Sequence, residues 1–262
     1  MTVHVEFGDR VAVITLDRPE RRNAVDHATI LELLAAQRAI AEACTDEARV
    51  GAAGDGAGAV DSSVRAVVLT GAPPAFSAGA DLTGVEEGRF AADLSAVLRG
   101  FAALPLPVIA AIDGPALGAG AQLAVAADLR VATPESVIGV PAAKLGLVVD
   151  HWTVRRLADE FTPPVARAML VAAETYTGER LHALGGVHRL GTRSDALGWA
   201  AALSGLAPLT MRGHKLALEH ARPEPPIDER FEEARRTAWA SADAEEGRSA
   251  FLEKRPARFS GV

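Results

Sequence analysis

Apolar and polar residues alternate one by one near the start of the chain, in two runs at Val3–Phe7 and Arg10–Leu16. A period of two places the apolar side chains on one face of an extended segment, which is typical of β-strands. Gly8-Asp9 stands between the runs and is a residue pair that favours a tight turn. The pattern therefore predicts a β-hairpin.

Downstream of this hairpin, helix-like and strand-like segments alternate. Asp26 is expected to cap a helix, because the apolar residues of Thr29–Ala43 recur at helical spacing. Short β-branched apolar runs predict buried strands. In chain order the further predictions are a strand at Arg65–Thr70, a helix at Phe90–Leu104, a strand at Val108–Ile112, a helix at Leu117–Ala126 and a strand at Asp128–Ala132. Such alternation favours an α/β fold with crossover helices, and from about Thr153 the pattern becomes mainly helical.

The composition restricts the class of protein. The chain has 262 residues, 49% of them hydrophobic and 23% charged, which is typical of a globular protein. A net charge of −7 argues against broad nucleic-acid binding. Cys44 is the single cysteine, which excludes an internal disulfide and favours the cytoplasm. We expect neither a transmembrane segment nor a signal peptide, since no apolar run reaches roughly 20 residues and no basic region opens the chain.

Several common motifs are absent. The sequence holds no G-x-S-x-G and no Walker A pattern, and its glycines do not form G-x-G-x-x-G. The seven histidines are scattered, and one cysteine is too few for a structural zinc site. We therefore expect no metal and no dinucleotide. The glycine- and alanine-rich segment Gly51–Gly58 is predicted to be a flexible surface loop.

Two loops of small residues follow the two central strands. The first reads GAPPAFSAGADL at positions 71–82, and the second reads DGPALGAGAQLA at positions 113–124. Small residues let a backbone approach a ligand closely, and a helix that opens near Gly118 offers free N–H groups. Two N–H donors from separate loops can form an oxyanion hole, which a thioester carbonyl needs when charge develops on its oxygen. Taken alone, each loop could equally be a tight strand-to-helix turn.

The chain resembles the crotonase superfamily, which includes enoyl-CoA hydratases and isomerases. Five colinear motifs carry the resemblance: ITLDRPERRNAV (14–25), AVVLTGAPPAFSAGADL (66–82), PVIAAIDGPALGAGAQLAVAADLRVAT (107–133), VPAAKLGL (140–147) and EEGRSAFLEKRPARF (245–259). The resemblance implies the crotonase (ClpP-like) spiral, an α/β fold of repeated ββα turns, over residues 1–195. It also implies a C-terminal helical region over residues 196–262 that builds a homotrimer or a hexamer.

The resemblance also assigns site residues, with acyl-coenzyme A as ligand or substrate rather than as a bound cofactor. It implies that the backbone N–H groups of Ala80 and Ala119 form the oxyanion hole. Phe251 and Lys254 match positions that reach a neighbouring subunit's coenzyme, although a solvated surface charge is the alternative for Lys254. Arg22 could bind phosphate or be a solvated turn residue. The remaining positions expected to line the coenzyme path are Ala24, Ala78, Gly79, Asp81, Leu82, Leu117 and Gly118.

The sequence departs from the family where hydratases place two glutamates around one water. Those positions hold Gln122 and Ala142 here, at an unchanged spacing. An amide cannot exchange a proton near neutral pH, and an alanine offers no polar group. Asp150 matches a proton-transferring aspartate of some isomerases, yet it precedes a helical stretch and could simply cap it. His151 and Trp152 are expected to narrow the acyl pocket.

These departures leave three functions open. The first is an acyl-CoA binder in fatty-acid or lipid metabolism, without normal hydratase activity, which hands its ligand to a lipid-synthesis enzyme. It is favoured because the runs GAGAQLAVAADLRV and LGLVVDHWTVRRL resemble a crotonase paralogue of mycolic-acid-producing bacteria that lacks the glutamate pair. The second is an enoyl-CoA isomerase, or a weak hydratase, that uses Asp150. The third is a purely structural interaction protein.

Overall fold

The computed structural model describes residues 1–50, 64–83, 87–221 and 228–261. The N-terminal hairpin is present as β1 (Val3–Gly8) and β2 (Val11–Leu16), which pair antiparallel. Its turn is Asp9-Arg10 rather than the predicted Gly8-Asp9, since both residues have positive φ (48° and 64°) and Gly8 pairs with Val11. A two-residue hairpin loop of this type needs φ above zero at both positions, and that places the turn one residue later.

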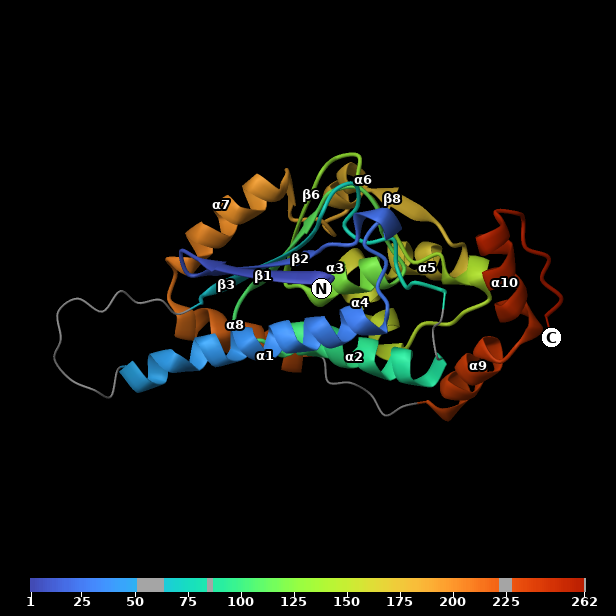
Figure 1. The fold of residues 1–262 in the computed structure, drawn as a ribbon, viewed down its shortest axis with the longest axis horizontal. Helices are drawn as coiled ribbons and strands as arrows, with labels where there is room; N and C mark the ends of the chain where they lie inside the picture. Colours follow the sequence, from blue (N-terminus) through green and yellow to red (C-terminus); the bar gives the residue numbers. More distant parts are fainter. Residues whose placement is uncertain (51–63, 84–86, 222–227, 262) are drawn as a thin grey trace.

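A six-stranded sheet forms the centre of the molecule, in the order β1-β2-β3-β4-β6-β9 (Figure 1). Apart from β1, all of its strands run parallel. Successive residues of β3 and β4 belong to two separate apolar clusters, so both faces of the sheet are buried. This explains the continuous apolar runs of these strands. The strands that follow β2 are β3 (Ala66–Gly71), β4 (Val108–Ile112), β6 (Leu129–Ala132) and β9 (Arg189–Leu190).

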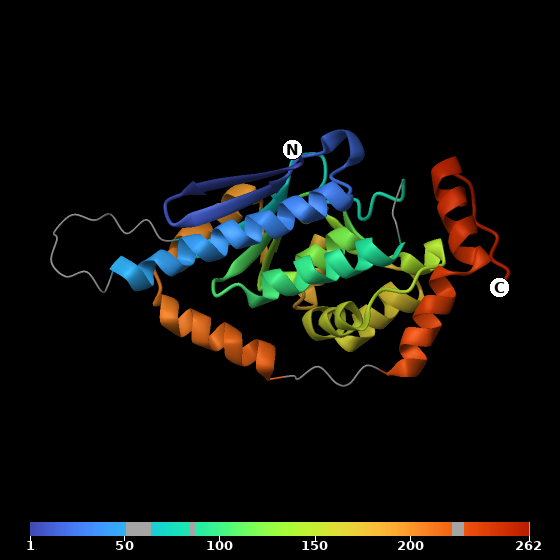
Figure 2. The same cartoon turned by 60° about the horizontal axis from the view of Figure 1, so that its bottom comes forward.

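Helices cover the two faces of this sheet. The long helices α1 (His27–Val50) and α2 (Glu87–Ala103) pack against each other on one face (Figure 2). α7 (Arg193–Ser204) packs on the other face, through the buried residues Ala196 and Ala200. The predicted cap of α1 is confirmed, because Asp26 accepts the N–H of Thr29 at 2.8 Å.

A second, three-stranded sheet produces the repeated turns of the spiral. After β4 the chain forms β5 (Ala116–Leu117) and then α3 (Ala119–Ala126). After β6 it forms β7 (Val137–Gly139), the 3-10 helix η2 (Ala142–Leu145) and α4 (His151–Phe161). Each turn therefore contributes one strand to each sheet and then a helix, as the predicted ββα repeat requires. The predicted helix start at Leu117 is wrong, because Leu117 belongs to β5 and pairs with Gly139 of β7, and α3 begins two residues later.

The C-terminal part is mainly helical, as predicted. It contains α5 (Pro163–Val171), β8 (Thr175–Thr177), α6 (Gly178–Ala183), α8 (Pro208–His220), α9 (Glu229–Trp239) and α10 (Ala242–Glu253). The predicted division between residues 195 and 196 falls inside α7, which packs on the sheet. α9 and α10 form one end of the molecule (Figures 1 and 2).

Two ion pairs, Lys215–Asp128 and Glu219–Arg156, connect α8 to the core. Lys215 pairs with Asp128 at 2.8 Å and donates to the carbonyls of Phe101 and Leu106. Burial raises the pKa of Asp128 and lowers that of Lys215, while the attraction between the two opposes both shifts. The leucines of α8 face outward instead: Leu209, Leu216 and Leu218 are each more than half exposed. The inward side of this helix therefore carries the ion-paired Lys215, while these three leucines lie on its outward side.

Two further predictions concern what the chain lacks. Across the described ranges, no helix has the length and apolar character needed to cross a lipid bilayer. In the same ranges, no three acidic, histidine or cysteine side chains are grouped so that they could hold a metal ion. The segment Gly51–Gly58, predicted to be a surface loop, lies outside the described residues.

Candidate functional site

The two loops of small residues lie against each other at the ends of β3 and β4. A Cβ atom at Gly79 would stand 2.8 Å from the carbonyl oxygen of Leu117, and one at Gly118 would stand 3.8 Å from the Cα of Gly79. Gly79 also has a φ of +106°, which side chains rarely tolerate. Glycine is therefore required at position 79 on two grounds, and the loops approach backbone to backbone.

The backbone of Ala80 is oriented by a parallel bridge to Val25. Val25 donates its N–H to the carbonyl of Gly79 at 2.7 Å, and Asp81 donates its N–H to the carbonyl of Val25 at 2.8 Å. Both bonds come from the neighbours of Ala80, so the N–H of Ala80 itself points away from Val25. Among the described residues, no acceptor is bonded to this N–H.

The second N–H belongs to Ala119, the first residue of α3. Gly118 precedes it with φ 52° and ψ −117°, and no side chain caps the helix. The first N–H groups of a helix have no partner within it, and the helix dipole favours negative charge there. The nitrogen of Ala119 lies 3.6 Å from the Cβ position of Gly79, directly beside Ala80. The two N–H groups therefore belong to segments that lie close together, which is what a pair of oxyanion-hole donors requires.

A buried asparagine that the sequence analysis did not single out holds the first loop. Asn23 is 1% exposed and has a left-handed backbone (φ 56°), which Asn tolerates better than most residues. Its Nδ2 donates to the carbonyls of Ala72 and Ala75 at 2.7 and 2.6 Å, and its Oδ1 accepts the N–H of Arg18. The only signal in the sequence was an asparagine between a turn and a helix.

Ser77 joins the first loop to both of its neighbours. Its hydroxyl donates to the carbonyl of Asn23 at 2.8 Å and accepts the N–H of Gly79 at 3.3 Å. Its backbone forms a parallel bridge to Ala116 of the second loop. The first turn of α3 also packs on it, because a Cβ at Gly120 would stand 2.4 Å from the carbonyl oxygen of Ser77. Ser77 thus sets the distance between the two donor segments.

The variant Ser77→Ala is expected to lower the free energy of unfolding by about 1–2 kcal/mol, since two buried hydrogen bonds are lost without any change in shape. Urea unfolding followed by circular dichroism measures this difference. Ser95→Ala, on the surface of α2, is the matched control and should leave stability unchanged. Equal stability of both variants and the parent would contradict the joining role of Ser77.

Asp81 and Ala24, both predicted to line the coenzyme path, are tied together by Arg18. Its guanidinium donates to the carbonyl of Ala24 at 2.7 Å and pairs with Asp81 at 3.2 Å. Burial would raise the pKa of Asp81, but hydrogen bonds from Thr83 and Arg18 outweigh it and hold that pKa below its usual value. The Asp81 carboxylate therefore supports the loop. A ligand is expected to contact the backbone of this segment and not this side chain.

Gln122 lies on α3 one turn after Ala119, and it is 6% exposed. Its Oε1 lies 3.3 Å from the hydroxyl of Thr153, a fully buried residue of α4. Thr153 in turn contacts Asp150, which accepts its N–H and its hydroxyl at 3.0 Å each. The predicted capping role of Asp150 is therefore confirmed. Ala142, at the other glutamate position, is the first residue of η2 and is half-buried.

The remaining predicted residues are placed as follows. Arg22 is exposed, and its carbonyl accepts the N–H of Ala78, so its backbone supports the first loop while its side chain is free to face solvent. Leu82 is half-buried at the end of that loop. Phe251 and Lys254 lie exposed at the end of α10, which packs on η2 of the same chain. Within one chain the structure does not bring these two to the paired loops.

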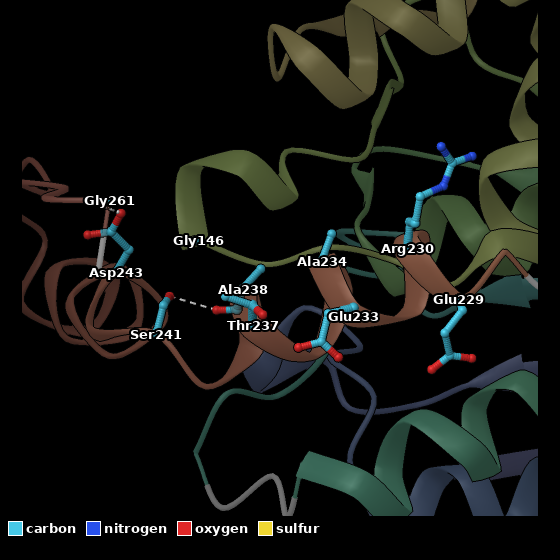
Figure 3. Close-up of a pocket in the computed structure, with 10 residues that line it drawn as sticks. All are labelled: Gly146, Glu229, Arg230, Glu233, Ala234, Thr237, Ala238, Ser241, Asp243 and Gly261. Atoms are coloured by element: carbon cyan, nitrogen blue, oxygen red, sulfur yellow. Dashed lines mark hydrogen bonds between the residues drawn. The ribbon is translucent and has the colours of Figure 1, made fainter.

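A cavity of about 820 Å³ lies elsewhere, between α9, α10 and the loop after η2 (Figure 3). Arg236 pairs with both of its acidic residues on α9, Glu229 and Glu233, at 3.2 and 2.6 Å. No lining residue belongs to the two loops of small residues, so this cavity is separate from the candidate site. It is lined by Gly146, Glu229, Arg230, Glu233, Ala234, Thr237, Ala238, Ser241, Asp243 and Gly261.

Comparison with solved structures identifies the fold. The crystal structure of an enoyl-CoA hydratase from Mycobacterium avium subsp. paratuberculosis superposes with a TM-score of 0.83 at 24% identity, over 99% of both chains. That of methylmalonyl CoA decarboxylase superposes with a TM-score of 0.84 at 23% identity, over 100% of this chain and 99% of that one. The chain therefore has the crotonase fold, as predicted.

Sequence comparison then establishes the family. The sequence model described as enoyl-CoA hydratase/isomerase matches residues 58–262. A probable enoyl-CoA hydratase of Mycobacterium tuberculosis, echA6, is 41% identical over 99% of this chain and 100% of its own length. A putative enoyl-CoA hydratase of Thermus thermophilus is 35% identical over 98% and 100%. The chain belongs to the enoyl-CoA hydratase/isomerase family.

Proposed function

We propose that this protein binds acyl-CoA thioesters for fatty-acid or lipid metabolism and does not hydrate enoyl-CoA at a normal enzymatic rate. The observation that supports binding is a pair of N–H groups, at Ala80 and Ala119, that have no acceptor among the described residues and lie on adjacent segments. A thioester carbonyl oxygen placed between them would accept two hydrogen bonds. Acyl-coenzyme A is thus proposed as the ligand, and no resident cofactor is required for that role.

The proposed lack of hydratase activity rests on the two glutamate positions of the family. Hydration of a double bond needs a base to activate water and an acid to deliver a proton. Gln122 and Ala142 supply neither group. Asp150, the remaining acidic residue of this region, already accepts two hydrogen bonds from Thr153. The proposed site therefore binds and polarises a thioester but has no group that transfers a proton.

One experiment tests both halves of the proposal. Purified protein is titrated with crotonyl-CoA in a calorimeter, and the same mixture is followed by the ultraviolet absorbance of the conjugated thioester. We expect binding with no turnover above a trace. A turnover number on the order of 10 s⁻¹, which is typical of enzymes, would contradict the proposed deficiency. Absence of heat with crotonyl-CoA and with a long-chain acyl-CoA would contradict the binding function and favour a structural interaction protein.

An isomerase that uses Asp150 is the second candidate, because this carboxylate belongs to a network that reaches Gln122. The variant Asp150→Asn separates the two roles, since an asparagine still caps a helix but cannot transfer a proton. The binder proposal expects no isomerisation of a 3-enoyl-CoA by the parent or by the variant. Isomerisation by the parent that Asp150→Asn abolishes would establish the isomerase instead.

We further propose that the chain assembles as a homotrimer or as a hexamer built from trimers. The three outward leucines of α8 support this proposal, since apolar side chains gathered on one helix surface are typical of contact sites. Phe251 and Phe259, near the C-terminus, are also exposed. In such an assembly Phe251 and Lys254 would approach the ligand of a neighbouring copy. We also propose that the protein contacts a lipid-synthesis enzyme. Its proposed location is the cytoplasm. Sedimentation equilibrium measures the oligomeric state directly.

A further inference from the structure

Strand β1 forms one edge of the six-stranded sheet, and among the described residues no further strand pairs with its outer side (Figure 2). Its register with β2 is continuous from Val3 to Gly8, without a bulge, and the strand contains no proline. Bulges and prolines are two of the features that keep an edge strand from pairing with another chain. Exposure rises along the strand, and Phe7 is 53% exposed. β1 can therefore accept a further strand.

The backbone groups of alternate residues point toward this open side. Residues that flank a two-residue hairpin loop exchange hydrogen bonds, so Gly8 and every second residue before it bond to β2. The hydrogen bond from the N–H of Asp17 to the carbonyl of Thr2 agrees with this alternation. The N–H and C=O groups of Val5 and Phe7 therefore face outward, and no described residue is bonded to them. A strand laid alongside β1 would bond to these groups.

A second copy of β1 complements this edge in one antiparallel register. With Val5 opposite Val5 of the second copy, residues 3–7 of both strands overlap fully and His4 lies opposite Glu6. A shift by two residues in either direction places Glu6 against Glu6 or His4 against His4, and like charges directly opposite each other are destabilising. His4 contacts Asp17 through Nε2 at 3.0 Å, so its second ring nitrogen remains for Glu6 of the other copy. Charge and overlap therefore favour the same register.

Apolar side chains line the other face of the paired strands. In this register Val5 lies opposite Val5 and Phe7 lies opposite Val3, and apolar cross-strand pairs stabilise antiparallel sheets. Pairing would also remove part of the exposed ring of Phe7 from water. The N–H of Val3 already donates to Glu32 at 2.8 Å, so the ladder between two copies would end at the carbonyl of Val3.

We propose that two copies of this chain pair through their β1 strands in this register, and that this contact joins two trimers into the hexamer. Such a contact has two-fold symmetry, because each strand meets the same residues of the other. One pair of short strands is a small interface, but three such pairs between two trimers would act together. The role in the hexamer rests on the proposed trimer, whereas the pairing depends neither on that trimer nor on thioester binding.

Disulfide cross-linking tests the register. In a Cys44→Ser background, Val5→Cys places two sulfurs on directly opposite residues, whose Cα atoms lie about 5.5 Å apart. Glu6→Cys is the matched control, because position 6 is more exposed but is displaced from its own copy by two residues, about 7 Å along the strand. We expect Val5→Cys to form a covalent dimer about 10-fold faster under mild oxidation. Equal or faster cross-linking of Glu6→Cys, or none in either variant, overturns the pairing.

Sedimentation equilibrium measures the assembly without a cross-link. Val5→Pro removes an outward N–H that bonds no described residue, and proline is tolerated on an edge strand at such a position. The parent should have twice the mass of Val5→Pro, whether the unit that doubles is a trimer or a single chain. Equal masses overturn the inference. Doubling of a single chain would contradict the proposed trimer and its hexamer but support the β1 pairing.

The charge pattern is tested in the same experiment. Glu6→Lys places a cation opposite His4 and should weaken the doubling about 10-fold, because two like-charge contacts replace two favourable ones. The double variant His4→Glu/Glu6→Lys restores opposite charges and should recover most of the association. Glu135→Lys, on the exposed turn between β6 and β7, is the control with the same change of charge. Unchanged association in Glu6→Lys overturns the register, and this variant decides if Val5→Pro does not fold.

Discussion

The double variant Gln122→Glu/Ala142→Glu is expected to hydrate crotonyl-CoA about 10²–10⁴ times faster than the parent. It supplies the two carboxyl groups that a single water needs, one as base and one as acid, beside the N–H groups of Ala80 and Ala119 that are proposed to polarise the thioester. Position 122 lies one helical turn from the N–H of Ala119, and position 142 opens η2. The measurement is the loss of absorbance of the conjugated thioester.

A matched control separates this effect from a general change of charge. Gln122→Glu/Ala143→Glu carries the same two new charges, but residue 143 is exposed on η2 rather than at the family's second glutamate position. This control and both single variants should stay at the level of the parent. Equal rates in the two double variants would mean that the missing carboxylates are not what limits hydration.

The variant Ala119→Pro is expected to weaken polarisation of the thioester, because it removes one of the two proposed N–H donors. In the double variant that restores both glutamates, it should lower kcat about 10²- to 10³-fold, the usual cost of losing one oxyanion donor. Proline is suited to this test because position 119 is the first residue of α3, where a fixed φ is tolerated and the N–H bonds nothing within the helix. Gly118 precedes it, and glycine adapts best to the restriction that proline imposes.

Polarisation can also be read without any turnover. A bound cinnamoyl-CoA with a para-dimethylamino group absorbs at longer wavelength when its carbonyl oxygen receives hydrogen bonds. The parent should shift this absorbance, and Ala119→Pro, which retains only the N–H of Ala80, should shift it less. Ala119→Gly is the control, since it removes the methyl group and keeps the N–H. An unchanged shift in Ala119→Pro would exclude this N–H as a donor, and an unchanged thermal midpoint would show that the helix still forms.

The larger elements could be predicted from the sequence because each has its own periodicity. The hairpin, the buried strands β3 and β4 and the cap at Asp26 all follow from local patterns. The short strands β5, β7, β8 and β9 could not be predicted, since two or three residues carry no period. Their extended form depends on neighbours distant in sequence, as Leu117 shows by pairing with Gly139.

Part of the candidate site was visible in the sequence for a similar reason. Small residues at positions 79, 118 and 119 indicate a close backbone approach, and the structure places these segments together. Asn23 and Thr153 act across 52 and 31 residues of chain, through side-chain hydrogen bonds that no local pattern encodes. The outward leucines of α8 are another such case, because helical spacing predicts an apolar face but not which side the core takes.

Arg18 and Asn23, whose side chains hold the first loop, limit how far the chain can be shortened without losing the candidate site. The family match begins at residue 58, yet the residues that orient Ala80 come from 18–25, ahead of that point. A fragment starting at residue 58 would also leave the edge of β3 bare where β2 pairs with it. A fragment that starts at residue 58 should therefore fail to hold the Ala80 segment in place, and only a fragment that retains the hairpin together with Arg18 and Asn23 is expected to keep the candidate site intact.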